Sequence, residues 1–119
     1  METRLKKQKD FDAVFNKGDR IYTKTVTLLY IKKESFKFGI SLSKKHGKAH
    51  LRNYIKRIIR ACVREVIKDG VNPYYIVVLP KVRENYVFSE IKNDIFYALK
   101  KGKIISDYEN TFSTYKVLP

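Results

Sequence analysis

Residues 44–64 read KKHGKAHLRNYIKRIIRACVR, and this stretch predicts the central element of the fold. From Leu51 onward its apolar residues recur at three- and four-residue spacings, which predicts a helix with one apolar face. The residues of this face are Leu51, Ile55, Ile58, Ile59, Cys62, Val66 and Ile67. We expect the helix to begin at about residue 49 or 50 and to end near Lys68, with one face in the core.

The other face of this helix carries charge of a single sign. The stretch contains eight basic residues and no acidic one: Lys44, Lys45, Lys48, Arg52, Lys56, Arg57, Arg60 and Arg64. Like charges spaced four residues apart destabilise a helix by about 0.2–0.5 kcal/mol per pair, and no acidic residue intervenes before Glu65. A face that is merely solvated usually mixes signs, so the pattern favours an anionic polymer as a partner.

Composition supports a folded, strongly basic protein. The 119 residues include 26 Lys and Arg against 12 Asp and Glu, a net charge of +14, and 44% are hydrophobic. This length suits one domain with one core, spanning 1–119, with 1–8 and 103–119 expected at its periphery. Such a charge favours phosphate-bearing partners, of which nucleic acid is the commonest.

The single cysteine and the hydropathy pattern suggest where the protein resides. Cys62 stands alone on the apolar helix face, which excludes a disulfide framework and predicts a buried thiol. No apolar run reaches the length of a membrane span, and the N-terminal METRLKKQKD lacks the apolar core of a signal peptide. We therefore expect a soluble, cytoplasmic protein.

The residues before the central helix predict a short helix and then strands. In KDFDAVFNKG, Phe11, Val14 and Phe15 share one helical face, and Gly18 predicts a left-handed C-cap. The two phenylalanines suit either the core or a stacking platform for unpaired bases, and the residue pattern alone favours the core. A period of two then predicts a short strand near 20–23 and a hairpin of strands near 25–32 and 36–42.

The residues after the central helix predict one strand and one helix. The run at 74–79, YYIVVL, predicts a strand buried on both faces and closed by Pro80. A last helix is expected from Ser89, as N-cap, to Lys101, with Gly102 ending it. Four residues beyond it have an edge strand or the surface as alternatives: Ile104, Ile105, Phe112 and Tyr115. The expected order is αβββαβα.

Arrangements that could support catalysis are nearly absent from the sequence. His46 and His50 could share a helical face as zinc ligands do, but lysines surround them and no third ligand stands nearby. We interpret Glu90 and Asp94 as surface acids near a helix N-terminus rather than a catalytic pair. No phosphate-binding glycine motif appears either. We expect no bound metal or cofactor, no small-molecule substrate and no chemistry by the protein alone.

Phosphate binding is the chemistry that these residues do support. Lysines at 44, 45 and 48 supply point charges just before the helix N-terminus, where free N–H groups also attract anions. Arginines can hold phosphates through two parallel hydrogen bonds, and Asn53 can contact a sugar or a base edge. This interpretation predicts steep salt dependence and little sequence preference.

The string GISLSKKHGKAHLRNYIKRIIR, at 39–60, resembles the signature of the protein subunit of bacterial ribonuclease P. The matching positions are Gly39, Ser41, Ser43, Lys44, Lys45, Gly47, Ala49, Arg52, Asn53, Lys56, Arg57 and Arg60. The segment LKKQKDFDAVFNKG is similar to the opening helix of the same family, with Phe11, Phe15 and Gly18 matching. The likeness covers about 5–102. One position departs from it: Tyr54 replaces the last arginine of an Arg-Asn-Arg motif, which removes one expected phosphate contact.

The resemblance implies an α+β fold of the ribosomal protein S5 domain 2-like type, a two-layer α/β sandwich. Its mainly antiparallel four-stranded sheet would contain a left-handed βαβ crossover through the long basic helix. In that family the RNA subunit performs Mg²⁺-dependent removal of the 5′ leader from precursor tRNA, and the protein is non-catalytic. Magnesium would therefore be bound through the RNA.

The resemblance also implies roles for particular residues. The RNA-binding set would be Lys44, Lys45, Lys48, Arg52, Asn53, Lys56, Arg57, Arg60 and Arg64. Phe11 and Phe15 would line a cleft for the single-stranded leader, which reverses the preference for the core. Two other classes remain open: a ribosomal or RNA-chaperone protein, which would bind RNA regardless of leader, and a small DNA-binding protein with the basic helix in a major groove.

Overall fold

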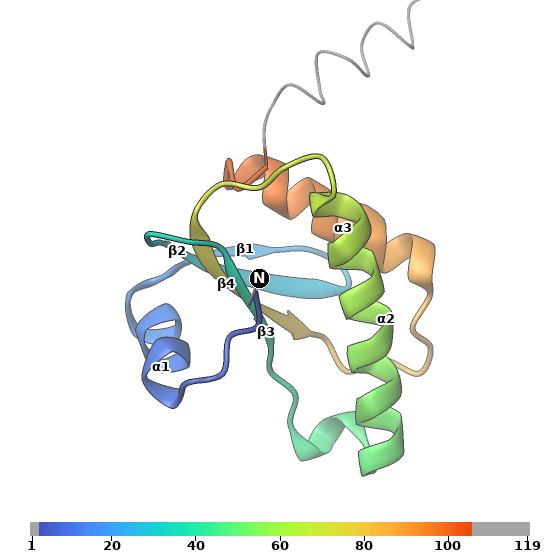
Figure 1. Cartoon of the computed structure of the whole chain (residues 1–119). Coiled ribbons are helices and arrows are strands. Elements are labelled where there is room, and N and C mark those ends of the chain that lie inside the picture. Colours follow the sequence, from blue (N-terminus) through green and yellow to red (C-terminus); the bar gives the residue numbers. More distant parts are fainter. Residues whose placement is uncertain (1–2, 106–119) are drawn as a thin grey trace, which may run out of the picture.

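The computed structural model describes residues 3–105, which form one sheet and its helices in the expected order (Figure 1). The elements are α1 (Gln8–Lys17), β1 (Asp19–Tyr22), β2 (Val26–Lys32), β3 (Lys37–Ile40), the short 3₁₀ helix η1 (Lys44–His46), α2 (Ala49–Ile67), β4 (Tyr74–Pro80) and α3 (Phe88–Lys101). The predicted bounds of the central helix and of the 74–79 strand are confirmed to within a residue. Phe112 and Tyr115 lie outside the described residues.

The strands form a mixed four-stranded sheet in the order β1-β2-β4-β3. β2 pairs antiparallel with β1 and β4, whereas β3 pairs parallel with β4. The predicted hairpin of the second and third strands is therefore wrong, because β4 lies between them. Ile76, Val77 and Val78 of β4 are fully buried, and a strand buried on both faces is best placed between two partners.

Helices cover both faces of the sheet, unequally. α2 and α3 pack on one face, where Leu28, Ile76 and Val78 contact the apolar faces of both helices in the main core. α1 packs on the opposite face, where Val14 is buried with Leu29 and other side chains in a smaller cluster. Figure 1 shows the sheet between α1 on one side and α2 with α3 on the other. The α2–α3 layer and the sheet form the sandwich that the resemblance implies.

Residues at both ends of the described range pack into the fold, where the sequence predicts a peripheral position. Leu5 is buried, its N–H donates to the Phe38 carbonyl over 2.9 Å, and the Phe38 N–H donates to the Thr3 carbonyl over 2.8 Å. The expectation that residues up to 8 are peripheral is thus wrong for 3–5, which pair with the edge strand β3. At the other end Ile104 and Ile105 are buried in the main core, so these two residues neither form an edge strand nor lie on the surface.

Two helix-capping predictions are also wrong. Gly18 follows α1 in an extended conformation, with φ −75° and ψ 157°, rather than a left-handed one. Glycine is needed there for space, because a Cβ would lie 2.4 Å from the Val14 carbonyl oxygen. α3 begins at Phe88 with Val87 at the N-cap position, so Ser89 lies within the helix.

Asp94 and Glu90 have different roles in α3. Asp94 accepts hydrogen bonds from the Thr25 N–H and hydroxyl, at 2.9 and 2.6 Å, which joins α3 to the turn between β1 and β2. Thr25 is itself buried. The interpretation of Asp94 as a surface acid is therefore wrong, whereas Glu90 forms an exposed ion pair with Arg83 at 3.7 Å.

Candidate nucleic-acid interface

The basic loop before α2 is held in place by His46. Nδ1 of His46 accepts a hydrogen bond from the Ser43 N–H over 3.1 Å, so its Nε2–H donates to the Pro80 carbonyl, 2.6 Å away. The ring thus joins η1 to the end of β4, with both nitrogens engaged by the protein. His50 lies exposed in the first turn of α2, and residues 3–105 contain no cluster of His, Cys, Asp and Glu suited to a metal ion.

This anchored loop displays its lysines to solvent. Ser43 caps η1 by accepting a hydrogen bond from the Lys45 N–H over 3.3 Å. Gly47 then turns the chain with φ at 106°, a value that favours glycine. Lys44, Lys45 and Lys48 are all exposed. The loop therefore places three cations at the N-terminus of α2, where backbone N–H groups also favour anions.

The cations of α2 divide between two sides of the helix. Arg52 and Lys56 face the first side, where they line a cleft with α1. The second side has a shallow depression, lined by Asn53, Arg57, Arg60 and Arg64 of α2 together with Arg4 from the N-terminal segment. We call the four α2 residues the outer α2 surface. All nine predicted RNA-binding residues therefore lie on η1, α2 and the turn between them.

The α1–α2 cleft encloses about 570 Å³ between α1, the β3–η1 connection and the first half of α2. Its lining residues are Gln8, Phe11, Phe15, Ile40, Ser41, Leu42, Ser43, Lys44, Arg52 and Lys56. Aromatic rings thus stand on one wall and cations on the other. Bases stack on aromatic rings while cations contact phosphates, so the cleft has the composition of a single-strand binding groove.

Phe11 and Phe15 combine the two roles that the sequence left as alternatives, packing in the core and lining a binding surface. Each ring is half-buried and packs against the smaller core cluster, and each also lines the α1–α2 cleft. Gly39 allows this arrangement, because a Cβ there would lie 2.7 Å from the Phe11 ring. The two rings are therefore fixed by core contacts while part of their surface faces the cleft.

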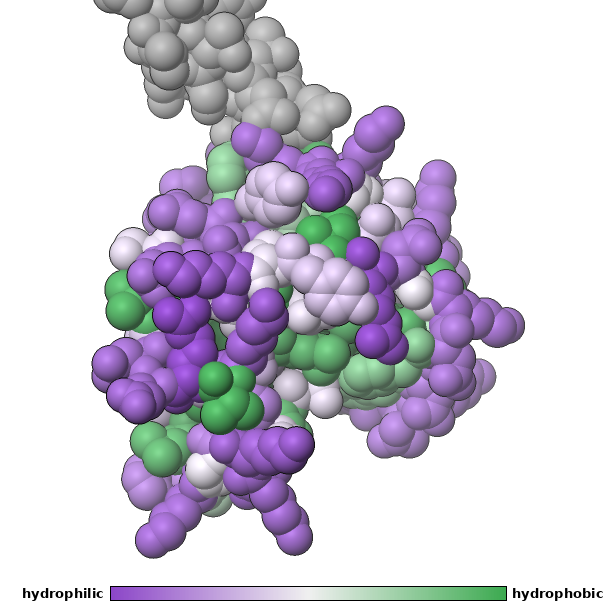
Figure 2. Space-filling view, turned by 180° about the vertical axis from the view of Figure 1, so that it is seen from behind, coloured by the Kyte–Doolittle hydropathy of each residue, from purple (hydrophilic) through white to green (hydrophobic). Residues whose placement is uncertain are grey.

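A polar surface alone does not distinguish this interface from the rest of the protein. Hydrophilic side chains also cover most of the face seen from behind in Figure 2, around a smaller apolar area at its centre. What distinguishes η1 and α2 is that all of their acidic and basic side chains except Glu65 are basic. The one acidic residue of α2, Glu65, pairs with Lys92 of α3 at 2.7 Å, which lowers its pKa and leaves the arginine row unneutralised.

A family model described as Ribonuclease P matches residues 1–103. The chain belongs to the ribonuclease P protein family. It is 36% identical over 112 residues to a ribonuclease P protein component of Listeria welshimeri, covering 90% of this chain and 93% of that one. The recognition made from residues 39–60 is confirmed.

Solved structures of the ribonuclease P protein family share the fold. The Staphylococcus aureus protein matches with a TM-score of 0.76 at 30% identity, covering 87% of this chain and 98% of its own. The Thermotoga maritima protein matches with a TM-score of 0.72 at 28% identity, covering 82% and 96%. The α+β fold class expected from the resemblance is confirmed.

Tyr54 and Leu51 give the N-terminal half of α2 an exposed apolar element. Tyr54, the departure from the family motif, is 48% exposed and Leu51 is 45% exposed. The assignment of Leu51 to the core face is wrong, because this end of α2 extends beyond the sheet (Figure 1). An exposed Tyr54 ring can stack on a base or ribose where a guanidinium would contact phosphate.

Sequence reasoning missed one cation of this interface. Arg4 lines the depression with Arg57 and Arg60 although more than fifty positions separate it from them in the chain. Periodicity could not have placed it there, since its position follows from the pairing of residues 3–5 with β3.

Residues 3–105 contain no helix long and apolar enough to cross a membrane.

Proposed function

We propose that this chain is the RNA-binding protein subunit of a ribonuclease P that removes 5′ leaders from precursor tRNA. In this proposal η1 and the outer α2 surface contact the catalytic RNA, and the α1–α2 cleft holds the single-stranded leader. Cleavage is carried out by the RNA with Mg²⁺. Membership of the family supports the role in tRNA maturation, and the arrangement of cations supports the mode of binding.

The one-signed surface of α2 carries the proposal. Arg57 and Arg64 are exposed, and neither ion pair described in residues 3–105 includes them, since these pairs join Arg83 to Glu90 and Lys92 to Glu65. Repulsion along this row makes the isolated helix less stable, and phosphates would relieve it. An RNA backbone supplies such charges at a regular spacing.

The α1–α2 cleft suits a strand whose bases are unpaired. Phe11 and Phe15 offer ring surface on α1, and Arg52 and Lys56 offer positive charge across from them. A mature tRNA has no leader to occupy this groove. Occupation of the cleft therefore explains how the subunit would favour precursor over product.

Two groups capable of chemistry are held in structural roles. His46 donates to Pro80, and Cys62 is buried with its thiol 3.7 Å from the Phe88 carbonyl. Burial raises the pKa of Cys62 to about 11, so the thiolate is scarce at neutral pH. This supports the proposal that the RNA subunit performs the cleavage. The cations of α2 would aid it by reducing the repulsion between the phosphates of the catalytic RNA and those of its substrate.

The test is cleavage of precursor tRNA by a bacterial ribonuclease P RNA at low Mg²⁺, with and without this protein. We expect strong stimulation that falls when the leader is shortened to one or two nucleotides. Equal binding to unrelated RNAs with no stimulation would instead indicate a ribosomal or chaperone protein. Cleavage by the protein alone would contradict the non-catalytic role.

A further inference from the structure

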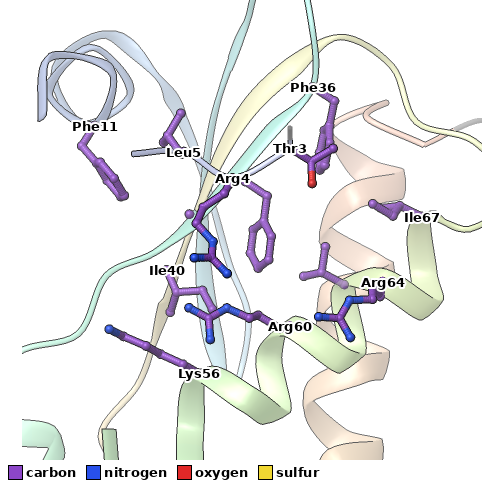
Figure 3. A pocket seen from close by; sticks show the side chains of 13 residues that line it. Thr3, Arg4, Leu5, Phe11, Phe36, Ile40, Lys56, Arg60, Arg64 and Ile67 are labelled. Atoms are coloured by element: carbon purple, nitrogen blue, oxygen red, sulfur yellow. The ribbon is translucent and has the colours of Figure 1, made fainter. Parts of the chain in front are cut away.

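A separate hollow adjoins the α1–α2 cleft at the β3 edge of the sheet, beside the N-terminal segment that pairs with β3. It lies between β3, the second half of α2 and residues 3–5, and it encloses about 300 Å³ (Figure 3). Its floor is apolar and partly aromatic, built from Phe36, Phe38, Ile40, Val63 and Ile67. Volumes of this size lie at the lower end of the range for small-ligand sites.

Every charged residue that lines this edge hollow is basic. Arg4 comes from the N-terminal segment, and Lys56, Arg60 and Arg64 come from three successive turns of α2. No lining residue is acidic, and neither ion pair described in residues 3–105 includes Lys56, Arg60 or Arg64. Figure 3 shows the Arg4 and Arg60 side chains directed toward one another at the mouth. Such a concentration of one charge favours an anion at this point.

We infer that the edge hollow holds one unpaired nucleotide of a bound RNA strand, with its base on the apolar floor and its phosphate at the basic rim. A bare phosphate would leave the aromatic floor unused. A purely apolar ligand would have to lie beside four cations. A nucleotide combines a flat base with a phosphate group, and aromatic and arginine side chains are the usual partners of unstacked bases.

The position of the rim connects the edge hollow to the rest of the interface. Arg60 and Arg64 line both the hollow and the outer α2 surface, and Lys56 lines both the hollow and the α1–α2 cleft. A strand whose phosphates contact α2 therefore runs past the mouth of the hollow. The inference rests on the proposed function in this respect, because it assigns the nucleotide to an RNA bound along α2.

The test is a titration of the full chain followed through its backbone amides by NMR. The probes are 5′-AMP, adenosine, inorganic phosphate and a five-nucleotide oligoadenylate. We expect 5′-AMP and the oligonucleotide to shift the amides of Leu5, Phe38 and Arg64. Adenosine and phosphate should bind at least about tenfold more weakly than 5′-AMP, because each supplies only half of the recognised chemistry.

Matched variants separate local recognition from total charge. Arg64→Gln should weaken 5′-AMP binding by up to about fivefold, as expected for the loss of one exposed ion pair. Phe36→Leu should weaken it while keeping the floor apolar. Arg20 is exposed on β1, at the opposite edge of the sheet, so Arg20→Gln removes the same charge far from the hollow and should leave binding unchanged. Thermal unfolding verifies that each variant is folded.

Three outcomes would overturn the inference. Phosphate binding as tightly as 5′-AMP would show that charge alone is recognised. Binding of 5′-AMP without any response of the hollow to the oligonucleotide would exclude RNA as the source. Shifts confined to the α1–α2 cleft would place the nucleotide elsewhere. The leader-dependent cleavage assay is independent of these results, so a chain that stimulates cleavage without filling the hollow refutes only this inference.

Discussion

Replacing Arg57 with alanine tests the RNA interface most directly. Arg57 is exposed on the outer α2 surface and belongs to neither ion pair described in residues 3–105, so its loss should change the free energy of unfolding by less than about 0.5 kcal/mol. If Arg57 contacts one phosphate of helical RNA, the variant should release about 0.9 fewer counterions than the original chain when it binds. The slope of log K against log salt should become shallower by that amount, and affinity near 0.15 M salt should fall about fivefold.

The assay is binding of the variant to a bacterial ribonuclease P RNA over a series of salt concentrations. Arg20→Ala is the matched control, because it removes the same charge from the sheet edge farthest from β3. An unchanged slope for Arg57→Ala would remove Arg57 from the interface. Equal changes in both variants would mean that RNA responds to net charge rather than to the surface of α2.

Three further predictions concern the cleft, α3 and the buried thiol. Phe15→Ala should weaken binding of precursor tRNA by the equivalent of about 1–3 kcal/mol and spare mature tRNA; equal losses, or unfolding, would assign the ring to the core alone. Asp94→Ala should lower the free energy of unfolding in urea by about 1–3 kcal/mol, because two donors of buried Thr25 lose their acceptor. Glu90→Ala should cost at most about 1 kcal/mol, and similar losses for the two would refute this distinction. The pKa of Cys62 is raised by burial from 9.0 to about 11, so its contribution to stability is complete below pH 9 and is lost as the pH rises toward 11. A thiol reagent at pH 8 should therefore modify the folded chain far more slowly than the urea-unfolded chain, and equal rates would contradict burial.

Local patterns predicted the elements that carry the interface. The spacing of apolar residues indicated the position of α2, and the one-signed charge row indicated its anionic partner. These features could be recognised because helical periodicity and like-charge repulsion act between residues three or four positions apart. The same holds for β4, whose run of β-branched residues indicated burial on both faces.

Contacts between distant residues were decided only by the tertiary structure. β4 lies between β2 and β3, although the chain continues directly from β2 to β3, because the strand with two apolar faces needs a partner on each side. The same burial of apolar surface draws Leu5 onto β3, whereas Asp94 is held at Thr25 by two hydrogen bonds. Neither contact has a signature in the neighbouring sequence.

The sequence by itself therefore determined which surface is basic and which helix bears it. The tertiary structure decided what stands opposite that helix: Phe11 and Phe15 across the α1–α2 cleft, and Arg4 across the edge hollow. The physical reason is the range of the forces involved. Helical and strand periodicities arise from near neighbours in the chain, whereas a cleft forms where distant segments compete to bury apolar surface against the same sheet.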